Sequence, residues 1–256
     1  MIEAAAGLLR RGLRLALDAV LPPQCLSCGT VVETAGALCN ACWTKVAWIA
    51  PPLCAACGRP FEFDPRAAGA TERLVCGACL REPPDFARAR AVFRYDDASR
   101  GLVLGFKHAD RTHGAPAFGR WLARAGGELL ADAETVAPVP LHWTRLAWRR
   151  FNQSALLAQA AAIEARRPFV PDLLVRRRRT PTQGDMGRAA RERNVRRAFI
   201  VHPKRHDAVA GKRIVLVDDV FTTGATVSEC TRTLLAAGAH AVDVLTLARV
   251  VRPEAA

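Results

Sequence analysis

The second half of the chain alternates short apolar segments with longer segments in which apolar and polar residues are mixed. Four apolar segments have the length of buried strands: residues 91–94, 136–139, 214–217 and 241–247. Two longer segments predict helices: residues 153–165 and 227–237. The last two strands and the helix between them form a βαβ unit, which joins parallel strands. We therefore expect an α/β fold in which helices flank a mostly parallel sheet.

The first 21 residues predict a separate amphipathic helix that ends before Pro22. Its apolar side chains repeat on one helical face: Leu9, Leu13, Leu17 and Val20. We expect this face to dock on the body of the protein, and we consider binding to a membrane surface less favoured. Arginines follow the short apolar run 4–9, unlike in a secretory signal, and no segment approaches the ~20 apolar residues of a membrane span. We therefore expect a cytoplasmic protein without a membrane span.

The net charge of +13 over 256 residues is concentrated in one part of the chain. Residues 176–205 contain eleven basic and two acidic residues, so this stretch alone carries +9. Such a segment is expected to face an anionic partner, although a solvated face rich in arginine is the simpler alternative for any single residue.

Eight of the nine cysteines form four Cys-x-x-Cys pairs between residues 25 and 79. Without a secretory signal a disulfide framework is disfavoured, and four successive pairs outside a βαβ pattern favour metal binding over thioredoxin-type redox chemistry. Eight thiolates suffice for two closed, structural zinc sites. Sequential pairing is the simplest arrangement, with one site of Cys25, Cys28, Cys39 and Cys42 and a second of Cys54, Cys57, Cys76 and Cys79.

The segment 214–226 combines a buried strand with groups that bind phosphate and sugar. The aliphatic run ends at Val217 and is followed by two carboxylates, Asp218 and Asp219, and by a Thr-Thr-Gly-Ala-Thr turn that opens a helix. Ligands of parallel α/β proteins bind at this end of a strand, and helix N-termini bind phosphate. The carboxylates can accept hydrogen bonds from sugar hydroxyls or hold hydrated Mg²⁺. A turn with purely local caps is the alternative, but the full string favours a phosphorylated sugar.

This string resembles the signature of type I phosphoribosyltransferases, which bind phosphoribosyl pyrophosphate (PRPP) together with Mg²⁺. The resemblance implies that Asp218 and Asp219 contact the ribose hydroxyls. It also implies that the following loop holds the 5′-phosphate through Thr222, Thr223, Gly224, Ala225 and Thr226. Val217 precedes the acidic pair and is included in the expected binding site.

With two zinc sites in front of this domain, the chain resembles the ComF family of competence-associated proteins over nearly its whole length. The strings that carry this resemblance are Gly105–His108, Pro138–His142, Arg149–Gln153 and Thr180–Gln183. Departures from the family pattern occur at Arg150 and at residues 184–186. The resemblance implies that Lys107 and a pyrophosphate loop ending in Pro140, Leu141 and His142 bind PRPP. It also implies that the basic stretch closes over the pyrophosphate, with Arg179 and Arg188 as the candidate catalytic arginines.

The expected organisation is a helix over 1–21, a double zinc ribbon over 22–85 and a phosphoribosyltransferase-like domain over 86–256. Two functions of different class remain open. In the first, the protein is an enzyme that transfers phosphoribosyl from PRPP to an acceptor. In the second, it is a non-catalytic PRPP- or nucleotide-binding competence protein that handles single-stranded DNA, with that DNA or proteins of the competence machinery as partners.

Overall fold

The computed structural model describes residues 22–62, 74–107, 109–180 and 187–251. The helix expected over residues 1–21 lies outside these ranges. The chain divides into two compact units, residues 1–45 and residues 46–256. The second unit therefore contains residues 46–85 together with the sheet, whereas the sequence suggested a boundary near residue 85. No helix in the described ranges is long and apolar enough to cross a membrane.

The described part of the first unit is a small cysteine-containing fold. Its chain reverses at an isolated antiparallel bridge between Gln24 and Val31, and it ends in the one-turn helix α2 (Asn40–Trp43). Few apolar side chains are buried here, since only Cys25 and Leu26 are almost fully covered between residues 22 and 45. A metal is therefore the natural source of stability for this unit.

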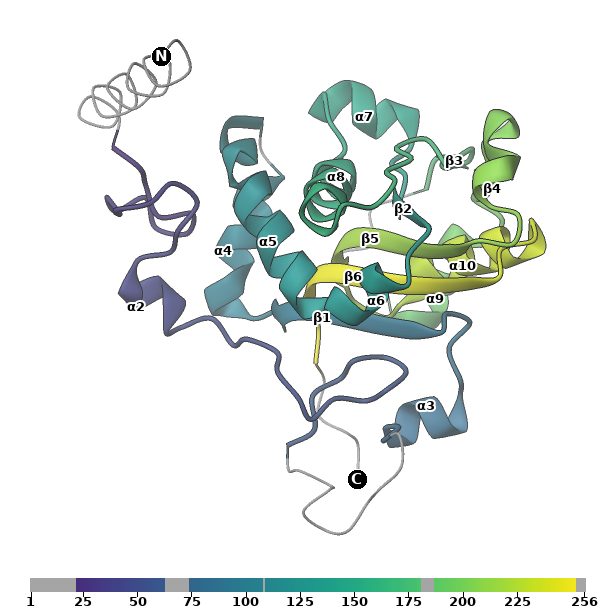
Figure 1. The fold of residues 1–256 in the computed structure, drawn as a ribbon, viewed down its shortest axis with the longest axis horizontal. Helices are drawn as coiled ribbons and strands as arrows, with labels where there is room; N and C mark the ends of the chain where they lie inside the picture. The colour runs from purple at the N-terminus through teal and green to yellow at the C-terminus, as the bar shows by residue number, and fades with distance from the viewer. Residues whose placement is uncertain (1–21, 63–73, 108, 181–186, 252–256) are drawn as a thin grey trace, which may run out of the picture. The chain divides into compact units, whose positions relative to one another are not determined.

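The second unit is built on a parallel sheet of four strands in the order β1 (Arg88–Arg94), β6 (Ala241–Arg249), β5 (Arg213–Phe221) and β2 (Thr135–Pro138) (Figure 1). All four strands were expected from the sequence. Strand β5 is longer than expected, because it continues past its aliphatic run through the two aspartates to Phe221. The central strands β5 and β6 are buried over most of their length, which agrees with their aliphatic composition.

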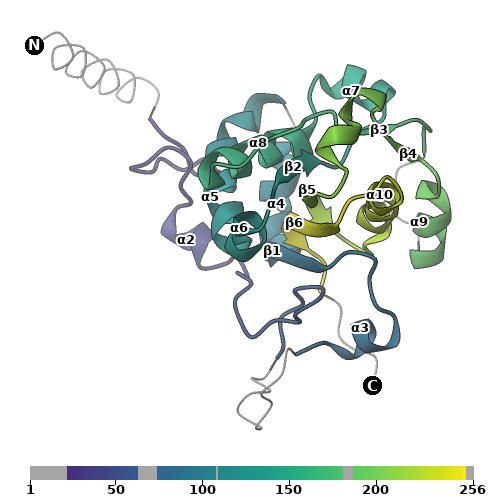
Figure 2. The ribbon, with the colours of Figure 1, turned by 45° about the vertical axis from the view of Figure 1, so that its right-hand side comes forward.

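Helices cover both faces of this sheet (Figure 2). On one face lie α5 (Ala115–Ala125), α6 (Gly127–Ala131) and α8 (Gln153–Ala165), of which α8 has the bounds expected from the sequence. On the other face lie α9 (Arg188–Val195) and α10 (Ala225–Ala236). The remaining helical segments are α3 (Gly77–Arg81), α4 (Asp97–Phe106), α7 (Trp143–Arg149) and two 3₁₀ turns over Ala109–Gly114 and Pro203–Ala208.

The basic stretch contains more regular structure than the sequence suggested. Its first residue, Arg176, ends β3 (Leu174–Arg176), which pairs antiparallel with β4 (Phe199–Val201), and α9 lies between the two strands in sequence. The guanidinium of Arg176 lies over the ring of Phe199, with 5.3 Å between its central carbon and the ring centre. This stacking and the long apolar stem of arginine explain how a basic sequence forms a partly buried strand.

Candidate functional site

Strand β5 places the two aspartates beside the first turn of α8. The Ser154 hydroxyl donates a hydrogen bond to Asp218 Oδ1 (2.8 Å), and Gln153 Nε2 donates to Asp219 Oδ2 (3.4 Å). Lys107, which follows α4, forms an ion pair with the same Asp219 oxygen at 2.9 Å. The acidic pair is therefore held by residues from α4 and α8 as well as by its own strand.

The surroundings of Asp218 favour the protonated form of its carboxyl group. Burial, and then the neighbouring charge of Asp219, raise the pKa of Asp218 to about 7, although hydrogen bonds from Ser154 and from the Asp219 amide act in the opposite direction. Asp219 has the ammonium of Lys107 beside it. Near neutral pH the site therefore holds a carboxyl group at Asp218 that can both accept and donate a hydrogen bond.

The loop after β5 forms the expected strand–turn–helix. Gly224 has φ of 83°, a left-handed conformation that a residue with a side chain adopts only with strain. A Cβ atom at this position would also lie 2.9 Å from Cζ of the Phe221 ring. Helix α10 begins immediately afterwards, at Ala225, whose amide donates to Thr223 Oγ1 (3.4 Å). The loop thus presents hydroxyl groups and a helix N-terminus, which together bind phosphate.

The acidic pair and this loop line one cavity of about 450 Å³. Its wall also carries five cationic side chains, which are those of Lys107, Arg145, Arg149, Arg176 and Arg191. With two carboxylates against five cations, the described lining has an excess of positive charge. The cavity is therefore suited to a ligand that carries several negative charges together with hydroxyl groups.

Arg176 is the most buried of these cations, with 7% of its surface exposed. One guanidinium nitrogen donates to the Thr180 hydroxyl, while its Nε has no hydrogen-bond partner among the described residues. Burial, and then the nearby charge of Arg145, lower the pKa of Arg176. Arg145 donates to the Thr180 carbonyl oxygen (3.0 Å), and its own pKa is lowered by burial and by Arg149 and Arg179. The positive charges of Arg176 and Arg145 thus lie close together in a poorly solvated place. A bound anion would stabilise both charges.

Most residues expected in the site line this cavity: Lys107, Pro140, Leu141, Asp218, Asp219, Thr222, Gly224, Ala225 and Thr226. Val217 is fully buried behind them. His142 is also buried, and its ring caps α7, where Nδ1 accepts from the Thr144 amide (3.3 Å). Arg179 is exposed and is not part of the cavity wall. Arg188 begins α9, and its side chain lies outside the described part of the structure.

Several polar residues of the cavity wall were not singled out by the sequence, among them Arg145, Arg149, Gln153, Ser154, Arg176 and Arg191, although the last two belong to the basic stretch. The sequence contained a signal for two of these residues, because Arg149 and Gln153 belong to one of the strings that carry the family resemblance. Arg176 opens the basic stretch, but its alternation with apolar neighbours in β3 is too short to distinguish it from Arg177, Arg178 or Arg179.

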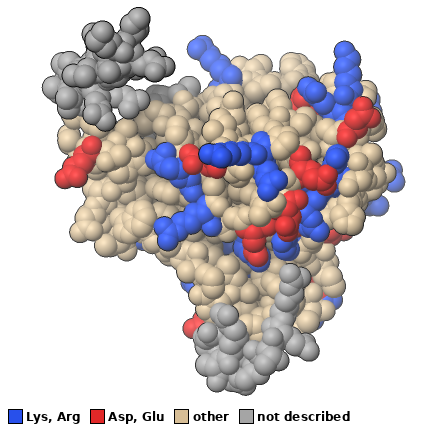
Figure 3. Space-filling view, viewed as in Figure 1, with Lys and Arg blue, Asp and Glu red and all other residues tan. Residues whose placement is uncertain are grey.

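A second cavity of about 1080 Å³ lies on the other side of the loop. Phe221, Thr222, Gly224 and Ala225 belong to the walls of both cavities, while Thr223 lines only the larger one. The other walls of the larger cavity come from α9, α10 and the second cysteine set. Both basic and acidic side chains line this cavity, and side chains of both signs also lie on the face drawn in Figure 3.

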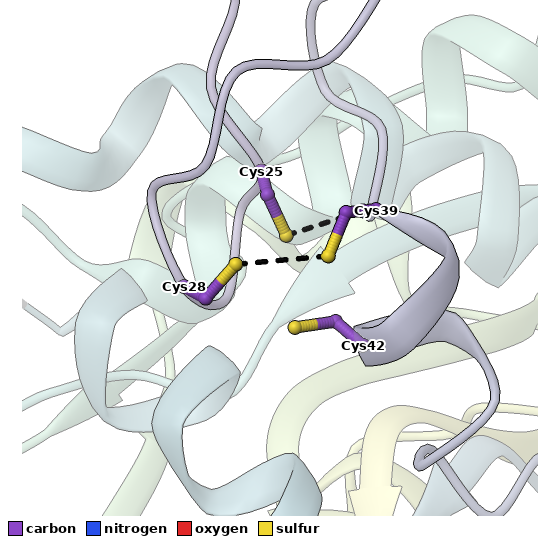
Figure 4. A group of neighbouring side chains, drawn as sticks. All are labelled: Cys25, Cys28, Cys39 and Cys42. Carbon is purple, nitrogen blue, oxygen red and sulfur yellow. Dashed lines mark hydrogen bonds between the residues drawn. The ribbon is translucent and has the colours of Figure 1, made fainter.

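The eight cysteines form the two sets expected from their spacing. Within each set the four sulfur atoms lie within 4.8 Å of one another. In the first set the four side chains point toward a common centre (Figure 4). Backbone amides donate to sulfur in both sets, for example Cys39 N to Cys25 Sγ (3.3 Å) and Cys76 N to Cys54 Sγ (3.3 Å). Four converging thiol groups supported by amide donors fit a structural zinc ion.

The two sets differ in burial. In the second set Cys54, Cys57 and Cys76 are buried and Cys79 is partly buried, whereas Cys28 of the first set is exposed. The hydrogen bond from Cys57, assisted by the amides of Cys76 and Cys57, lowers the pKa of Cys54 to about 4. A thiolate is thus already favoured at Cys54, as metal binding requires.

Two family models match this chain, a double zinc ribbon domain over residues 16–80 and a phosphoribosyl transferase domain over residues 152–254. The DNA utilization protein YhgH of Escherichia coli K12 is 34% identical over 220 residues, which cover 83% of this chain and 90% of the relative. Competence protein F of Haemophilus influenzae is 27% identical over 88% of this chain and 96% of its own length. Competence protein ComFC of Bacillus subtilis is 26% identical over 83% and 84%.

The raised pKa of Asp218 predicts a pH-dependent stability difference. A folded-state pKa above the ordinary value of 3.8 means that wild-type stability falls as the pH rises from about 4 to about 7. Asp218→Asn has no charge to bury. We therefore expect its free energy of unfolding to exceed that of the wild type by roughly 2–4 kcal/mol at pH 8 and by less at pH 5. Urea unfolding at both pH values measures the difference, with the exposed Asp207→Asn as control. A difference independent of pH would contradict this assignment.

Proposed function

This chain belongs to the ComF family, and from that membership we propose that the β5–α10 site binds PRPP with Mg²⁺ and transfers its phosphoribosyl group to an acceptor, releasing pyrophosphate. The observation that carries this proposal is that an acidic pair, a phosphate-type loop and an excess of arginines all line one cavity. Each of these features matches one chemical part of PRPP.

The ribose 5-phosphate part of PRPP matches the side of the cavity formed by β5 and α10. The Thr222–Thr226 loop would hold the 5′-phosphate with hydroxyl groups and the amides at the start of α10. Asp218 and Asp219 would then accept hydrogen bonds from the ribose hydroxyls. Lys107 forms an ion pair with Asp219, so that the negative charge of this buried carboxylate would be compensated before the sugar binds.

The pyrophosphate part of PRPP matches the arginine-rich side of the cavity. Arg176 and Arg145 lie close together without an acidic partner among the described residues. A pyrophosphate group would neutralise both charges and would supply an acceptor for the unpaired Nε of Arg176. As the bond from ribose to pyrophosphate breaks, these guanidinium groups would stabilise the charge that develops on the leaving group. Mg²⁺ bound to the pyrophosphate oxygens would supply further neutralisation.

The two cysteine sets would each hold one structural Zn²⁺ and take no part in the transfer. Four cysteine ligands leave no open coordination position for water or substrate. The described cysteines form no disulfide, which favours a reducing compartment, and we therefore propose a cytoplasmic location.

A second candidate function is the handling of single-stranded DNA. The names of the relatives, DNA utilization protein and competence protein, first direct attention to it. Its structural support lies on α7, where Trp143 is 70% exposed and Trp148 is 81% exposed. Arg145 and Arg149 lie on the same helix, so exposed aromatic rings stand next to positive charge. This combination is typical of surfaces on which the bases of single strands stack.

The PRPP proposal predicts that binding requires both Mg²⁺ and the acidic pair. In the double variant Asp218→Ala, Asp219→Ala we expect no measurable PRPP binding by calorimetry, because the ribose hydroxyls lose their acceptors. Asp172→Ala removes a carboxylate whose exposed ion pair with Arg205 lies outside the site, and it should bind PRPP like the wild type. The absence of PRPP binding by the folded, zinc-loaded wild type would refute the proposal. Pyrophosphate release across a panel of bases and amines then separates an enzyme from a PRPP-binding protein without turnover.

The pyrophosphate assignment predicts a selective loss in Arg176→Met. The loss of a charge-assisted contact should weaken PRPP binding by about 10–100-fold, while ribose 5-phosphate, which lacks the pyrophosphate, should bind as before. The matched control is Arg178→Met, since Arg178 is exposed and donates to the carbonyl oxygens of Asn194 and Arg196. Equal losses for both ligands would show instead that Arg176 serves only the local fold.

The DNA candidate predicts weak, steeply salt-dependent binding of a single-stranded oligonucleotide. The double variant Trp143→Ala, Trp148→Ala should lower the affinity by about 1–3 kcal/mol for each base that no longer stacks. Trp43→Ala removes an exposed tryptophan from α2 in the other compact unit and serves as the control. Fluorescence anisotropy at two salt concentrations measures both effects. Binding that is insensitive to salt, or equal in all three proteins, would exclude this role for α7.

A further inference from the structure

The second cysteine set is built into the sheet domain. The turn that carries Cys54 and Cys57 is joined to strand β1 by a hydrogen bond from the Ala89 amide to the Ala56 carbonyl oxygen (2.7 Å). Gly58 closes this turn at φ of 68°, and a Cβ atom there would lie only 2.2 Å from the Ala89 carbonyl oxygen. Three cysteines of the set also belong to the same buried cluster as Phe221 and Ala225.

Arg249 connects this cysteine set to strand β5. It ends β6, is 7% exposed, and donates from Nη1 to the Cys57 carbonyl oxygen, while Nη2 lies 3.9 Å from Cys57 Sγ. Its guanidinium also lies over the Phe221 ring at 4.9 Å from the ring centre. Among the described residues no carboxylate forms an ion pair with Arg249, and its Nε has no hydrogen-bond partner. The buried positive charge therefore depends on the sulfur and the aromatic ring.

Phe221 in turn sets the shape of the phosphate-type loop. It is the last residue of β5, directly before Thr222, and its ring occupies the space into which a side chain at Gly224 would project. The Val250 amide donates to its carbonyl oxygen (2.8 Å), and the Phe86 ring meets its ring edge-on at 5.9 Å. A displaced Phe221 ring would no longer limit the conformation of residues 222–224.

We propose that zinc at the second cysteine set holds the loop in its phosphate-binding conformation through Arg249 and Phe221, which makes Arg249 a positioning residue for the 5′-phosphate. Zinc with four thiolates carries a net negative charge, which is the counter-charge that a buried guanidinium beside Cys57 requires. Without the metal the turn that carries Cys57 is no longer cross-linked to Cys76 and Cys79, so the Cys57 carbonyl oxygen and sulfur no longer hold Arg249 over Phe221. The phosphate part of this inference rests on the proposed function.

The first cysteine set provides an internal comparison. It lies in the other compact unit, and the sulfur contacts seen there in the described residues stay within positions 25–42. The two sets are alike in ligand number and in their Cys-x-x-Cys pairs, so a general effect of zinc on stability would arise from both. If the loop depends on the second set alone, the effect must pass through the contacts that join Cys57, Arg249, Phe221 and Gly224.

The test compares Cys79→Ser with Cys42→Ser in the full chain, because each removes the last cysteine of its set. Hydrogen–deuterium exchange of residues 219–228, measured without ligand, should be faster in Cys79→Ser and unchanged in Cys42→Ser. Ribose 5-phosphate should bind about 10-fold more weakly to Cys79→Ser, whereas pyrophosphate, which does not contact the loop, should bind within about twofold of wild type. Equal effects of the two variants on the loop would overturn the proposal.

Arg249→Met tests the same connection with both cysteine sets intact. We expect two zinc ions per chain by native mass spectrometry, faster exchange at residues 219–228 and the same selective loss of ribose 5-phosphate affinity, with partial recovery in Arg249→Lys. The control is Arg196→Met, an exposed arginine in the lining of the larger cavity. Unchanged loop exchange in Arg249→Met, or equal losses for ribose 5-phosphate and pyrophosphate, would overturn the proposal. If the wild type binds neither ligand, the proposed function fails, and the exchange measurement still decides whether the connection exists.

Discussion

The site depends on one constraint, which is that two buried arginines form no ion pair with a carboxylate of the described residues. Two arginines, Arg176 and Arg249, are each 7% exposed, and each has an Nε without a hydrogen-bond partner among the described residues. Each also lies over a phenylalanine ring, Phe199 for one and Phe221 for the other. A stacked ring compensates only part of a desolvated charge, so both guanidinium groups need an anion nearby. For Arg249 the fold supplies the sulfur of Cys57. Arg176 lines the open cavity, where an anionic ligand can take the same role.

Part of the fold could be predicted because its signal is local. The four strands of the sheet and helix α8 follow directly from apolar runs and helical periodicity. The continuation of β5 through Asp218 and Asp219 could not be predicted in this way, because carboxylates inside a strand require partners that are distant in sequence, such as Lys107 and Ser154. The same holds for the antiparallel pairing of β3 with β4, where stacking on Phe199 allows Arg176 to be buried.

The candidate site likewise contains residues that the sequence identifies and residues that it does not. The acidic pair and the phosphate-type loop are contiguous in sequence, so their residue types and order were sufficient to identify them. The arginines of the cavity wall come from α7, β3 and α9 and meet only in three dimensions. The two cysteine sets illustrate the limit most clearly, because two Cys-x-x-Cys pairs in each set predict the same kind of zinc site. Their difference arises from the fit of Gly58 against Ala89, a contact between residues 31 positions apart that no ligand spacing encodes.

The loop after β5 also contributes residues to the walls of two cavities. Phe221, Thr222, Gly224 and Ala225 face a cavity of about 450 Å³ on one side and one of about 1080 Å³ on the other. Thermodynamic linkage makes such a wall reciprocal: a molecule that shifts it from the larger side changes affinity on the smaller side, and a ligand on the smaller side changes the affinity for that molecule by the same factor. The site is therefore placed where occupancy of one cavity can be communicated to the other through the residues that line both, which include Val250.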